Sequence, residues 1–303
     1  MDNKDFELVL ELCKNEIKVD CLSDIKVQRL GGLTNKNYMV DTDKGLYVVR
    51  LPGDGTEELI NRENEHICTD LANQIDIDSQ LIYFEDKTGI KISRYIDEAE
   101  TLDDKLLREK QNMKDIAELF KKLHSCGKSI PVIFDVFEKI EEYEELIRRQ
   151  DNNFLWDDYE TVKNQVYDLK HEISEMNVQP VICHNDPLCE NFIKGKDRMY
   201  LVDWEYAGMN DPMWDLADVF IEAAFTTEEE EDFNVYYFGM EPEDHFKRRI
   251  LINKIFLDFL WSLWGKQRCT CGADLFEYAD ERYERAKEHL NLLLSIKQNW
   301  RKN

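Results

Sequence analysis

The sequence has no apolar run that approaches the roughly eighteen residues of a membrane-spanning helix. Its first residues, MDNKDFELVLELCKNEI, begin acidic and are interrupted by charge, unlike a signal peptide. Both absences argue against membrane insertion and against export. We therefore expect a soluble protein of the cytoplasm.

Basic residues are scarce, with 39 Lys and Arg against 64 Asp and Glu and a formal charge of −25. Such a field repels phosphate backbones and anionic lipid surfaces, so the composition argues against nucleic acid and membranes as partners. A small cationic substrate would be attracted, although solubility is the ordinary explanation of an acidic balance.

Cysteine pairs of the C-x-x-C type are missing among the eight cysteines, and Cys269-Thr270-Cys271 has no His or further Cys at ligand distance. This pattern is typical of reduced thiols. The apolar share of 43% and the six Trp exclude a disordered chain. A length of 303 residues is long for one core and fits two lobes.

The most specific chemistry lies in the segment 181–215. A short apolar run at 181–183 is followed by the polar loop HNDPLCEN at 184–191, and two further apolar runs flank a Gly-containing turn at 195–197. Apolar runs separated by such a turn predict a β-hairpin. The second strand of this hairpin ends at Asp203, so the loop and Asp203 should lie at neighbouring strand ends.

Metal-assisted phosphoryl transfer needs this convergence, because a carboxylate must orient the acceptor hydroxyl while oxygen ligands hold Mg²⁺. Protein kinases use H-R-D-x-x-x-x-N and a later D-F-G for this purpose. Here Asp186 is followed by Asn191 and then by Asp203 in the same register. We predict that Asp186 is the catalytic base and that Asn191 and Asp203 are metal ligands.

The alternative is a polar hairpin in which His184 and Asp186 only satisfy backbone groups. The joint spacing of Asp, Asn and Asp between flanking strands favours the kinase-like interpretation. The Arg of H-R-D, the Phe-Gly of D-F-G and an A-P-E after a long activation segment are absent. These absences favour a small-molecule acceptor over a protein acceptor.

A strand at 46–51 carries Arg50, which we predict to contact the nucleotide phosphates in place of the usual Lys. Its carboxylate partner is expected from a helix at 56–71, where Glu63 and Glu65 are both available and Glu65 is our choice. A solvated strand residue is the alternative for Arg50. The preceding GGLTNKN tip at 31–37 can bring backbone N–H groups close to phosphate, although it lacks the third glycine of G-x-G-x-x-G.

Helical periodicity replaces the strand pattern after residue 96. The predicted fold is therefore α+β, with a β-rich N-lobe at 1–96 and a mostly α-helical C-lobe at 97–303. Helices are expected in the C-lobe at 113–123, 135–149 and 158–176. A hinge should join the lobes, and its backbone groups should contact the adenine edge; the residues concerned are Arg94, Tyr95 and Ile96.

Two further expectations concern the chain after Asp203. Asp215 lies in a helix that should begin near Met213, and we expect it to brace the catalytic loop by accepting backbone hydrogen bonds. The stretch Thr227-Glu228-Glu229-Glu230 predicts a capping box at the start of another helix.

Long helices are also expected at 243–266 and 274–296. Trp261 and Trp264 share a face of the first helix at i, i+3, and Tyr278 belongs to the second. Two Trp and a Tyr can enclose a quaternary ammonium through cation–π contacts. On pattern alone, core packing of these aromatics is an equally good interpretation.

Five segments together carry a family resemblance: GGLTNKNY at 31–38, VVRL at 48–51, HNDPLCEN at 184–191, LVDWEYAGMNDPMWDLA at 201–217 and WSLW at 261–264. They resemble the choline/ethanolamine kinase family, and most of all its bacterial choline kinase branch within the aminoglycoside phosphotransferase-like kinases. The resemblance implies a two-lobed protein-kinase-like fold. It also implies transfer of the γ-phosphate of Mg·ATP to choline, giving phosphocholine and ADP.

The resemblance further implies residue roles. Asp186 would be the base, Asn191 and Asp203 would hold Mg²⁺, and Arg50 paired with Glu65 would contact phosphate. The residues implied around the nucleotide are Thr34, Asn35 and Asn37, and those implied around the choline cation are Glu205, Trp261, Trp264 and Tyr278.

Other acceptors on the same fold stay open, namely ethanolamine, thiamine or an aminoglycoside. A primary amine prefers carboxylates and carbonyls, whereas a trimethylammonium prefers an aromatic box, so the Trp pair favours choline. A catalytically silent nucleotide-binding scaffold is the alternative from another class, and intact Asp186, Asn191 and Asp203 argue against it. Both a monomer and a homodimer are compatible with the sequence.

Overall fold

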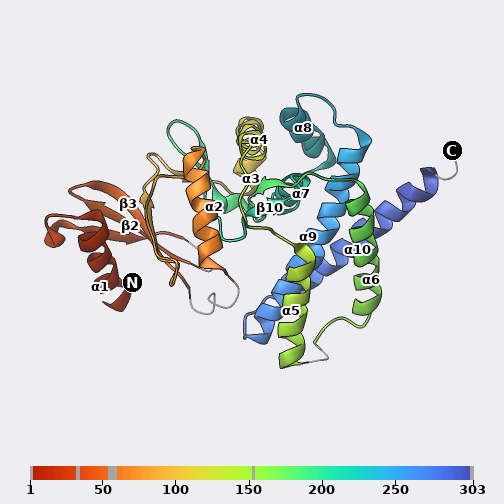
Figure 1. The fold of residues 1–303 in the computed structure, drawn as a ribbon, viewed down its shortest axis with the longest axis horizontal. Helices are drawn as coiled ribbons and strands as arrows, with labels where there is room; N and C mark the ends of the chain where they lie inside the picture. The colour runs from red at the N-terminus through yellow and green to blue at the C-terminus, as the bar shows by residue number, and fades with distance from the viewer. Residues whose placement is uncertain (1–2, 32–34, 54–59, 152–153, 301–303) are drawn as a thin grey trace. The chain divides into compact units, whose positions relative to one another are not determined.

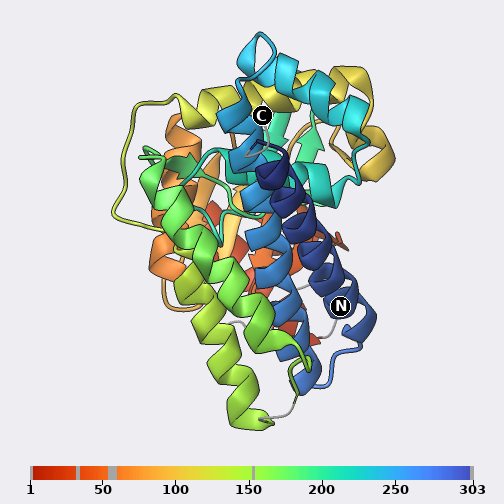
Figure 2. The same cartoon turned by 90° about the vertical axis from the view of Figure 1, so that its right-hand side faces the viewer.

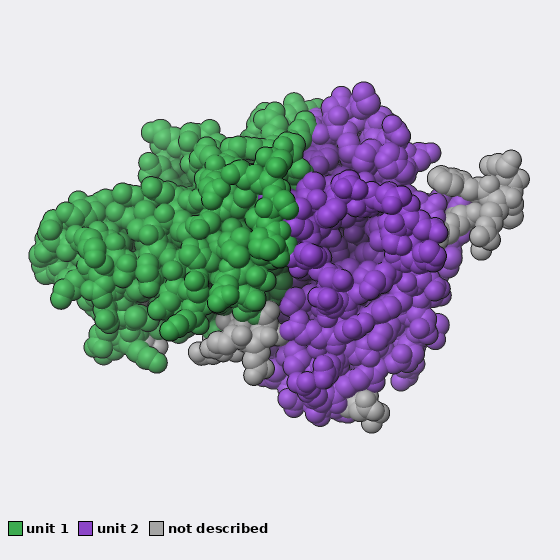
Figure 3. Space-filling view, viewed as in Figure 1, with its two compact units in different colours: residues 1–132, 186–208 green, residues 133–185, 209–303 purple. Residues whose placement is uncertain are grey.

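The computed structural model of the protein describes residues 3–31, 35–53, 60–151 and 154–300 (Figure 1). The chain forms two compact units, each made of two segments (Figure 3). Unit 1 comprises Met1–Val132 and Asp186–Gly208, and unit 2 comprises Ile133–Asn185 and Met209–Asn303. These units divide the chain at other places than residue 96, so the predicted lobe boundary stays a prediction.

Unit 1 contains the sheets and the shorter helices. Its elements are α1 (Asn3–Leu12), η1 (Cys13–Ile17), η2 (Leu22–Asp24), β1 (Lys26–Arg29), β2 (Lys36–Thr42), β3 (Gly45–Leu51), α2 (Arg62–Gln74), β4 (Leu81–Phe84), β5 (Lys91–Arg94), β6 (Glu100–Thr101), α3 (Asp104–Leu107), α4 (Lys110–His124), η3 (Cys189–Asn191), β8 (Phe192–Lys194) and β9 (Met199–Leu201). The main sheet has the strand order β1-β2-β3-β5-β4 and is antiparallel throughout.

The two faces of the main sheet differ because side chains alternate along each strand. On β3, Tyr47 and Val49 are buried in a hydrophobic core that includes Val9 of α1. Val48 and Arg50 point to the opposite face, where Val48 is only half-buried. This second face is therefore the one that can receive a ligand.

The predicted catalytic hairpin is confirmed as β8 and β9, which pair antiparallel. The Gly195 N–H donates to the Arg198 carbonyl at 2.9 Å and closes the turn between them. β6 pairs with the other edge of β8, so the strand order of this small sheet is β6-β8-β9.

Unit 2 is mainly helical, and all of it lies within the range 97–303 for which a mostly α-helical C-lobe was predicted. Its elements are α5 (Val136–Gln150), α6 (Tyr159–Glu175), β7 (Val181–Cys183), α7 (Met213–Glu222), α8 (Thr227–Phe238), α9 (Asp244–Thr270) and α10 (Phe276–Trp300), with most of β10 (Gly208–Asn210). The long helix α9 packs against α5, α7 and α10 (Figure 2). Among the described residues, no helix is both long and apolar enough to cross a bilayer.

Two helix starts differ from the sequence-based expectation. The predicted helix at 56–71 begins at Arg62, because the Asn61 side chain accepts a hydrogen bond from the Asn64 N–H and caps the helix there; residues 54–59 lie outside the described part. The capping box lies one residue earlier than predicted and joins Thr226 with Glu229.

Candidate functional site

The side chain of Asp215 holds the loop before Asp186 through hydrogen bonds with its backbone, as predicted. The Asp215 carboxylate accepts the His184 N–H at 2.9 Å and the Asn185 N–H at 2.8 Å. Asn185 has a φ of 67°, in the left-handed region that few residues other than glycine adopt, and its carbonyl accepts the Trp214 indole N–H at 3.0 Å. These four residues belong to unit 2 and fix the backbone conformation that leads into Asp186.

In unit 1, a tight turn brings the three predicted catalytic and metal-binding residues together. The Asn191 side-chain amide donates to the Asp186 carbonyl at 2.9 Å. The Asn191 carbonyl accepts the Val202 N–H at 3.0 Å, and Val202 directly precedes Asp203. Asp203 has a φ of 69°, which turns the chain sharply at the strand end. The predicted convergence of the loop with the end of the hairpin is confirmed.

Arg50 occupies the centre of a polar row across the face of the main sheet that lies opposite its hydrophobic core. The register pairs Asn37 with Arg50 and Arg50 with Lys91, and directly opposed residues share a face. The Arg50 side chain is 4% exposed, forms an ion pair with Glu65, and donates through Nη2 to the Gly89 carbonyl at 2.8 Å. The solvated alternative for Arg50 is therefore wrong.

Glu65, and not Glu63, is the partner of Arg50 in the structure. Its side chain is fully buried, and although burial alone would raise the pKa of Glu65, the positive charge of Arg50 and the hydrogen bond from it lower that pKa overall. Arg50 Nη1 also lies 3.4 Å from Asp203 Oδ1. The phosphate-contact candidate and the metal-ligand candidate are thus neighbours.

Arg62, the first residue of α2, is a member of this group that sequence reasoning missed. Its Nη1 lies 2.7 Å from Glu65 Oε2 and 3.3 Å from Glu205 Oε2, and its side chain is buried. A cation in the first turn of a helix opposes the helix dipole, so Arg62 needs these carboxylates. That misplaced positive charge, three residues before Glu65, is the signal that could have identified Arg62.

Glu205 is buried between donors within unit 1. The Asn35 side-chain amide donates to Glu205 Oε2 at 3.4 Å, beside Arg62. Burial raises the pKa of Glu205 to about 7, and the negative charge of Asp203 acts in the same direction. Its predicted position beside a substrate ammonium stays a prediction.

We call Arg50, Arg62, Glu65, Asp203 and Glu205 the unit 1 charge cluster. It holds three carboxyls and two guanidiniums, so it carries an excess of negative charge. With every carboxyl ionised the five side chains carry a net charge of −1, which attracts cations, and Asp203, 30% exposed, is the most accessible of them. Oxygen donors of this kind are those that Mg²⁺ prefers.

The side chain of Asn191 fits the same ion. Its amide nitrogen is bonded to the Asp186 carbonyl, so its oxygen is the atom presented to a ligand. Together with the Asp203 carboxylate it provides two oxygen ligands from neighbouring strand ends. The residues present therefore fit Mg²⁺.

Of the residues predicted to contact the nucleotide from the tip at 31–37, Asn37 lies beside Arg50 whereas Thr34 is not described by the structure. The structure places Asn37 opposite Arg50, with its amide donating to the Gly31 carbonyl at 3.2 Å. Met39 and Val48 form a half-buried pair next to this row, suited to the face of a purine. Thr34 lies outside the described residues.

The hinge segment, Arg94 to Ile96, uses part of its hydrogen-bonding capacity within the fold. The Arg94 N–H donates to the Gln80 carbonyl at 2.8 Å and the Tyr95 N–H to the Leu46 carbonyl at 3.1 Å. The Arg94 guanidinium lies 4.4 Å from the centre of the Tyr47 ring, on the face away from Arg50. A contact of Arg94 with a nucleotide would therefore involve its backbone and not its guanidinium.

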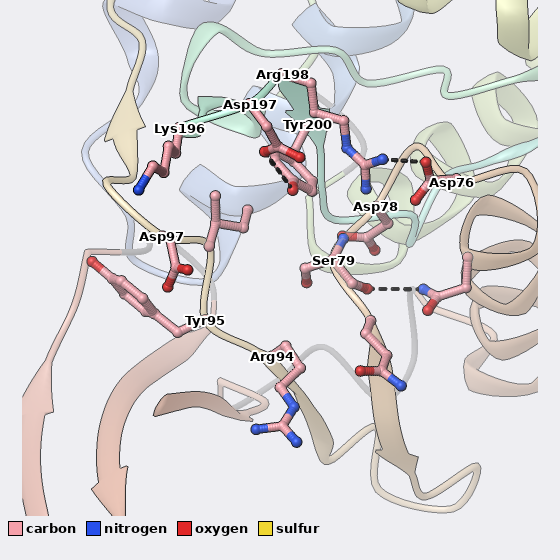
Figure 4. Close-up of a pocket in the computed structure, with 13 residues that line it drawn as sticks. Asp76, Asp78, Ser79, Arg94, Tyr95, Asp97, Lys196, Asp197, Arg198 and Tyr200 are labelled. Atoms are coloured by element: carbon pink, nitrogen blue, oxygen red, sulfur yellow. Dashed lines mark hydrogen bonds and ion pairs between the residues drawn. The ribbon is translucent and has the colours of Figure 1, made fainter. Parts of the chain in front are cut away.

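A cavity of about 550 Å³ borders the hinge segment (Figure 4). Its wall also includes the turn between β8 and β9, where the Tyr200 hydroxyl donates to Asp197 at 3.1 Å. The described lining includes neither Arg50 nor Asp203. The lining does include Asp78, whose pKa is raised mainly by burial and also by the negative charge of Asp203, so one wall of the cavity lies near the unit 1 charge cluster.

The three predicted cation-binding aromatics form a cluster in unit 2. The ring centres of Trp261 and Trp264 lie 6.3 Å apart, and those of Trp264 and Tyr278 lie 5.8 Å apart, both edge-to-face. Close approach of the helices depends on Gly265, where a Cβ would lie 2.9 Å from the Tyr278 ring. Trp261 is buried, whereas Trp264 and Tyr278 are half-buried and can offer ring surface to a ligand.

Comparison with known proteins agrees with this geometry. A family model described as choline/ethanolamine kinase matches residues 27–253. The crystal structure of choline kinase LicA from Streptococcus pneumoniae is 35% identical over 95% of this chain and 99% of its own, with a TM-score of 0.82. A structure of LicA in complex with AMP aligns over 95% and 98% of the two chains, at 35% identity and a TM-score of 0.79.

Curated relatives come from both sides of the family. Protein LicA of Haemophilus influenzae is 28% identical over 84% of this chain and 97% of its own length. Ethanolamine kinase 2 of Homo sapiens is 27% identical over 83% of this chain and 72% of its own. The predicted kinase-like α+β fold is confirmed by these matches.

Proposed function

Because this chain belongs to the choline/ethanolamine kinase family and is an ATP-dependent phosphotransferase that acts on an alcohol, we propose that it transfers the γ-phosphate of ATP to the hydroxyl of choline. The observation that carries this proposal is the turn around Asn191. The Asn191 side chain donates a hydrogen bond to the Asp186 carbonyl, and the Asn191 carbonyl accepts one from Val202, directly before Asp203. This turn would supply a base and two oxygen ligands at one place.

Asp186 would accept the proton of the choline hydroxyl as its oxygen attacks the γ-phosphorus. A new O–P bond forms, the bond between the γ-phosphorus and the bridging oxygen breaks, and ADP leaves with that oxygen. The hydrogen bonds from His184 and Asn185 to Asp215 hold the loop in place, so Asp186 needs little reorganisation to act.

Nucleotide positioning would fall to Arg50 and the face around it. Its guanidinium would contact the phosphates while Glu65 keeps it oriented, and Met39 and Val48 would lie against the adenine. Asn191 and Asp203 would hold Mg²⁺, which supplies positive charge beside the transferring phosphoryl group.

The aromatic cluster of unit 2 supports choline as the acceptor. Trp264 and Tyr278, which are half-buried and pack edge-to-face in a cluster with buried Trp261, would offer ring surface that attracts a trimethylammonium without requiring hydrogen bonds from it. Ethanolamine is the second candidate because curated ethanolamine kinases are among the relatives. We propose that the protein prefers choline to ethanolamine. We also propose that it acts in the cytoplasm.

The test is ADP release by the purified protein with ATP and Mg²⁺, with choline, ethanolamine, thiamine and kanamycin offered in parallel. We expect choline to give the highest kcat/KM, and Asp186→Asn to reduce the choline-stimulated kcat by about 10²–10⁴-fold. Asp197→Asn, in the β8–β9 turn of the same unit, is the matched control and should retain turnover. If another acceptor is preferred, the choline assignment is wrong while the catalytic roles stand.

The contribution of the cluster can be measured with Trp264→Ala. Loss of the indole should raise the KM for choline about ten-fold with a smaller change in kcat, because cation–π attraction is worth about 1–2 kcal/mol. An unchanged KM for choline would contradict the placement of choline at these rings. Omission of Mg²⁺ should abolish turnover in every variant.

A further inference from the structure

One guanidinium already lies against the aromatic cluster. Arg282 follows Tyr278 by one turn of α10, and its guanidinium carbon lies 4.9 Å from the centre of the Tyr278 ring. The Arg282 side chain is only 6% exposed. A charged group buried to this extent needs carboxylate partners, because desolvation of an unpaired charge is costly.

Those partners come from two other helices of unit 2. Arg282 forms an ion pair with Glu222, the last residue of α7, and its Nη1 lies 3.4 Å from Asp258 Oδ1 on α9. Asp258 is fully buried and also accepts hydrogen bonds from Arg285, at 2.8 and 2.6 Å. We call these four residues the unit 2 charge cluster. Its two carboxyls and two guanidiniums balance.

The consequence for a ligand depends on Glu222. Its side chain is 15% exposed, so it is the carboxylate of this cluster that lies nearest to solvent, and it is paired with the same arginine that covers Tyr278. A primary ammonium loses three hydrogen bonds to water when it is bound, and a carboxylate is the group that best replaces them. A trimethylammonium has no N–H group and makes no such demand.

We infer that Arg282 is a specificity-determining residue, which neutralises Glu222 beside the aromatic cluster and so favours a methylated ammonium over a primary one. The inference rests on the proposed function, since it concerns the substrate that the same cluster binds. With Glu222 engaged, the rings supply most of the attraction for the cation. Release of Glu222 would give the site an acceptor suited to ethanolamine.

The test is Arg282→Gln, with kcat/KM measured for choline and for ethanolamine. The ratio of the two values should shift toward ethanolamine by about ten-fold or more, because a hydrogen bond to a charged group commonly changes affinity by that factor. An unchanged ratio, with both substrates affected equally, would mean that Arg282 only supports the fold.

Two further variants separate specificity from stability. The double variant Glu222→Gln/Arg282→Gln removes the released carboxylate and should return the ratio to the wild-type value. Arg285→Gln is the matched control, because it removes the other guanidinium bound to Asp258 and should leave the ratio unchanged. A shift in Arg285→Gln equal to that in Arg282→Gln would overturn the inference.

If circular dichroism shows that Arg282→Gln does not fold, the inference is tested with Glu222→Gln instead. It leaves the Arg282 charge less compensated beside the rings, so the KM should rise for both cationic substrates, and an unchanged KM would overturn the inference. The proposed function is judged separately, on the wild-type protein. Absence of turnover with both amino alcohols would defeat the proposed function and this inference together, whereas wild-type turnover without a shift of the ratio would defeat the inference alone.

Discussion

Both units bury arginine–carboxylate groups, but the two charge clusters are built differently. In unit 1, two guanidiniums face three carboxyls, one of which, Asp203, is 30% exposed. In unit 2, two guanidiniums face two carboxyls, and Asp258 at the centre is fully buried. The first cluster therefore carries one negative charge in excess, whereas the charges of the second balance.

The pKa values of the buried carboxyls differ between the two clusters in the same way. Burial and the charge of Asp203 raise the pKa of Glu205 to about 7. Burial would also raise the pKa of Asp258, but His289 at 3.5 Å, the hydrogen bonds from Arg285 and the charges of both arginines lower it overall. A cluster that leaves a carboxyl poorly compensated attracts a cation, whereas a cluster with balanced charges does not.

The largest effect should come from Asp186→Asn, which separates activity from stability. Loss of the general base should reduce kcat by about 10²–10⁴-fold. The melting temperature should change little, because Asp186 is half-buried and the loop before it is held by Asp215. Steady-state kinetics and thermal unfolding of the same preparation test both statements. A large loss of stability with intact kcat would reverse the assignment.

The opposite result is expected for Asp258→Asn. Removal of one partner from a buried ion pair costs about 3–5 kcal/mol of unfolding free energy. Because the pKa of Asp258 is lowered in the folded protein, its stabilisation is present above the unfolded pKa of about 3.9 and is lost as the pH falls through the folded value. Urea unfolding at pH 7 and at lower pH should therefore show a difference from wild type that shrinks in acid.

A matched control for that variant is Asp280→Asn on α10. Asp280 is exposed, accepts the Trp156 indole N–H at 2.8 Å and pairs with Lys266. Its loss should cost about 1 kcal/mol or less. Equal destabilisation by the two substitutions would show that burial of the unit 2 charge cluster has no special role.

Glu205→Gln should stabilise the protein at alkaline pH and impair its activity. A carboxyl whose folded pKa is raised from 4.5 to about 7 favours folding in its protonated form, so its cost is full above pH 7 and disappears as the pH falls toward 4.5. The cost corresponds to about 3 kcal/mol. Thermal unfolding without Mg²⁺ should show the gain at pH 8 and none at pH 5; equal stability at pH 8 would contradict it.

Much of the helical architecture was predictable because its signals are local. Apolar periodicity located α5 and α6 within a residue or two of 135–149 and 158–176. The start of α2 was less accessible, since Asn61 as a cap competes with other polar residues before it. The capping box was displaced by one residue because Thr226 and Thr227 are adjacent and a run of Glu follows both.

The catalytic turn was predictable because one short segment contains all of it. In the unit 1 charge cluster the Arg50–Glu65 pair was predicted but Arg62 was not, and the unit 2 charge cluster was not predicted at all, since its members lie on helices that are distant in sequence. Glu65 could have been preferred on firmer grounds, because it lies on the face of α2 that buries Cys68 and Ala72. Arg282 belongs to a strongly charged helix, where nothing in the periodicity marks it as buried. A partner such as Glu222, 60 residues away, emerges only from the fold.

The smallest of these effects should be that of Arg62→Gln, which tests whether the unit 1 charge cluster acts as a unit. Arg62 shares Glu65 with Arg50 and compensates Glu205, so its loss should draw Arg50 toward the carboxylates and away from phosphate. We expect the KM for ATP to rise about ten-fold, because one hydrogen bond to a charged group is lost, and we expect a smaller change in kcat. Lys26→Gln, which removes an exposed cation on β1 of the same sheet, is the matched control and should leave the KM for ATP unchanged. An equal rise in both variants would mean that the KM responds to any change of charge in the sheet, and that Arg62 has no particular role in holding Arg50 in position.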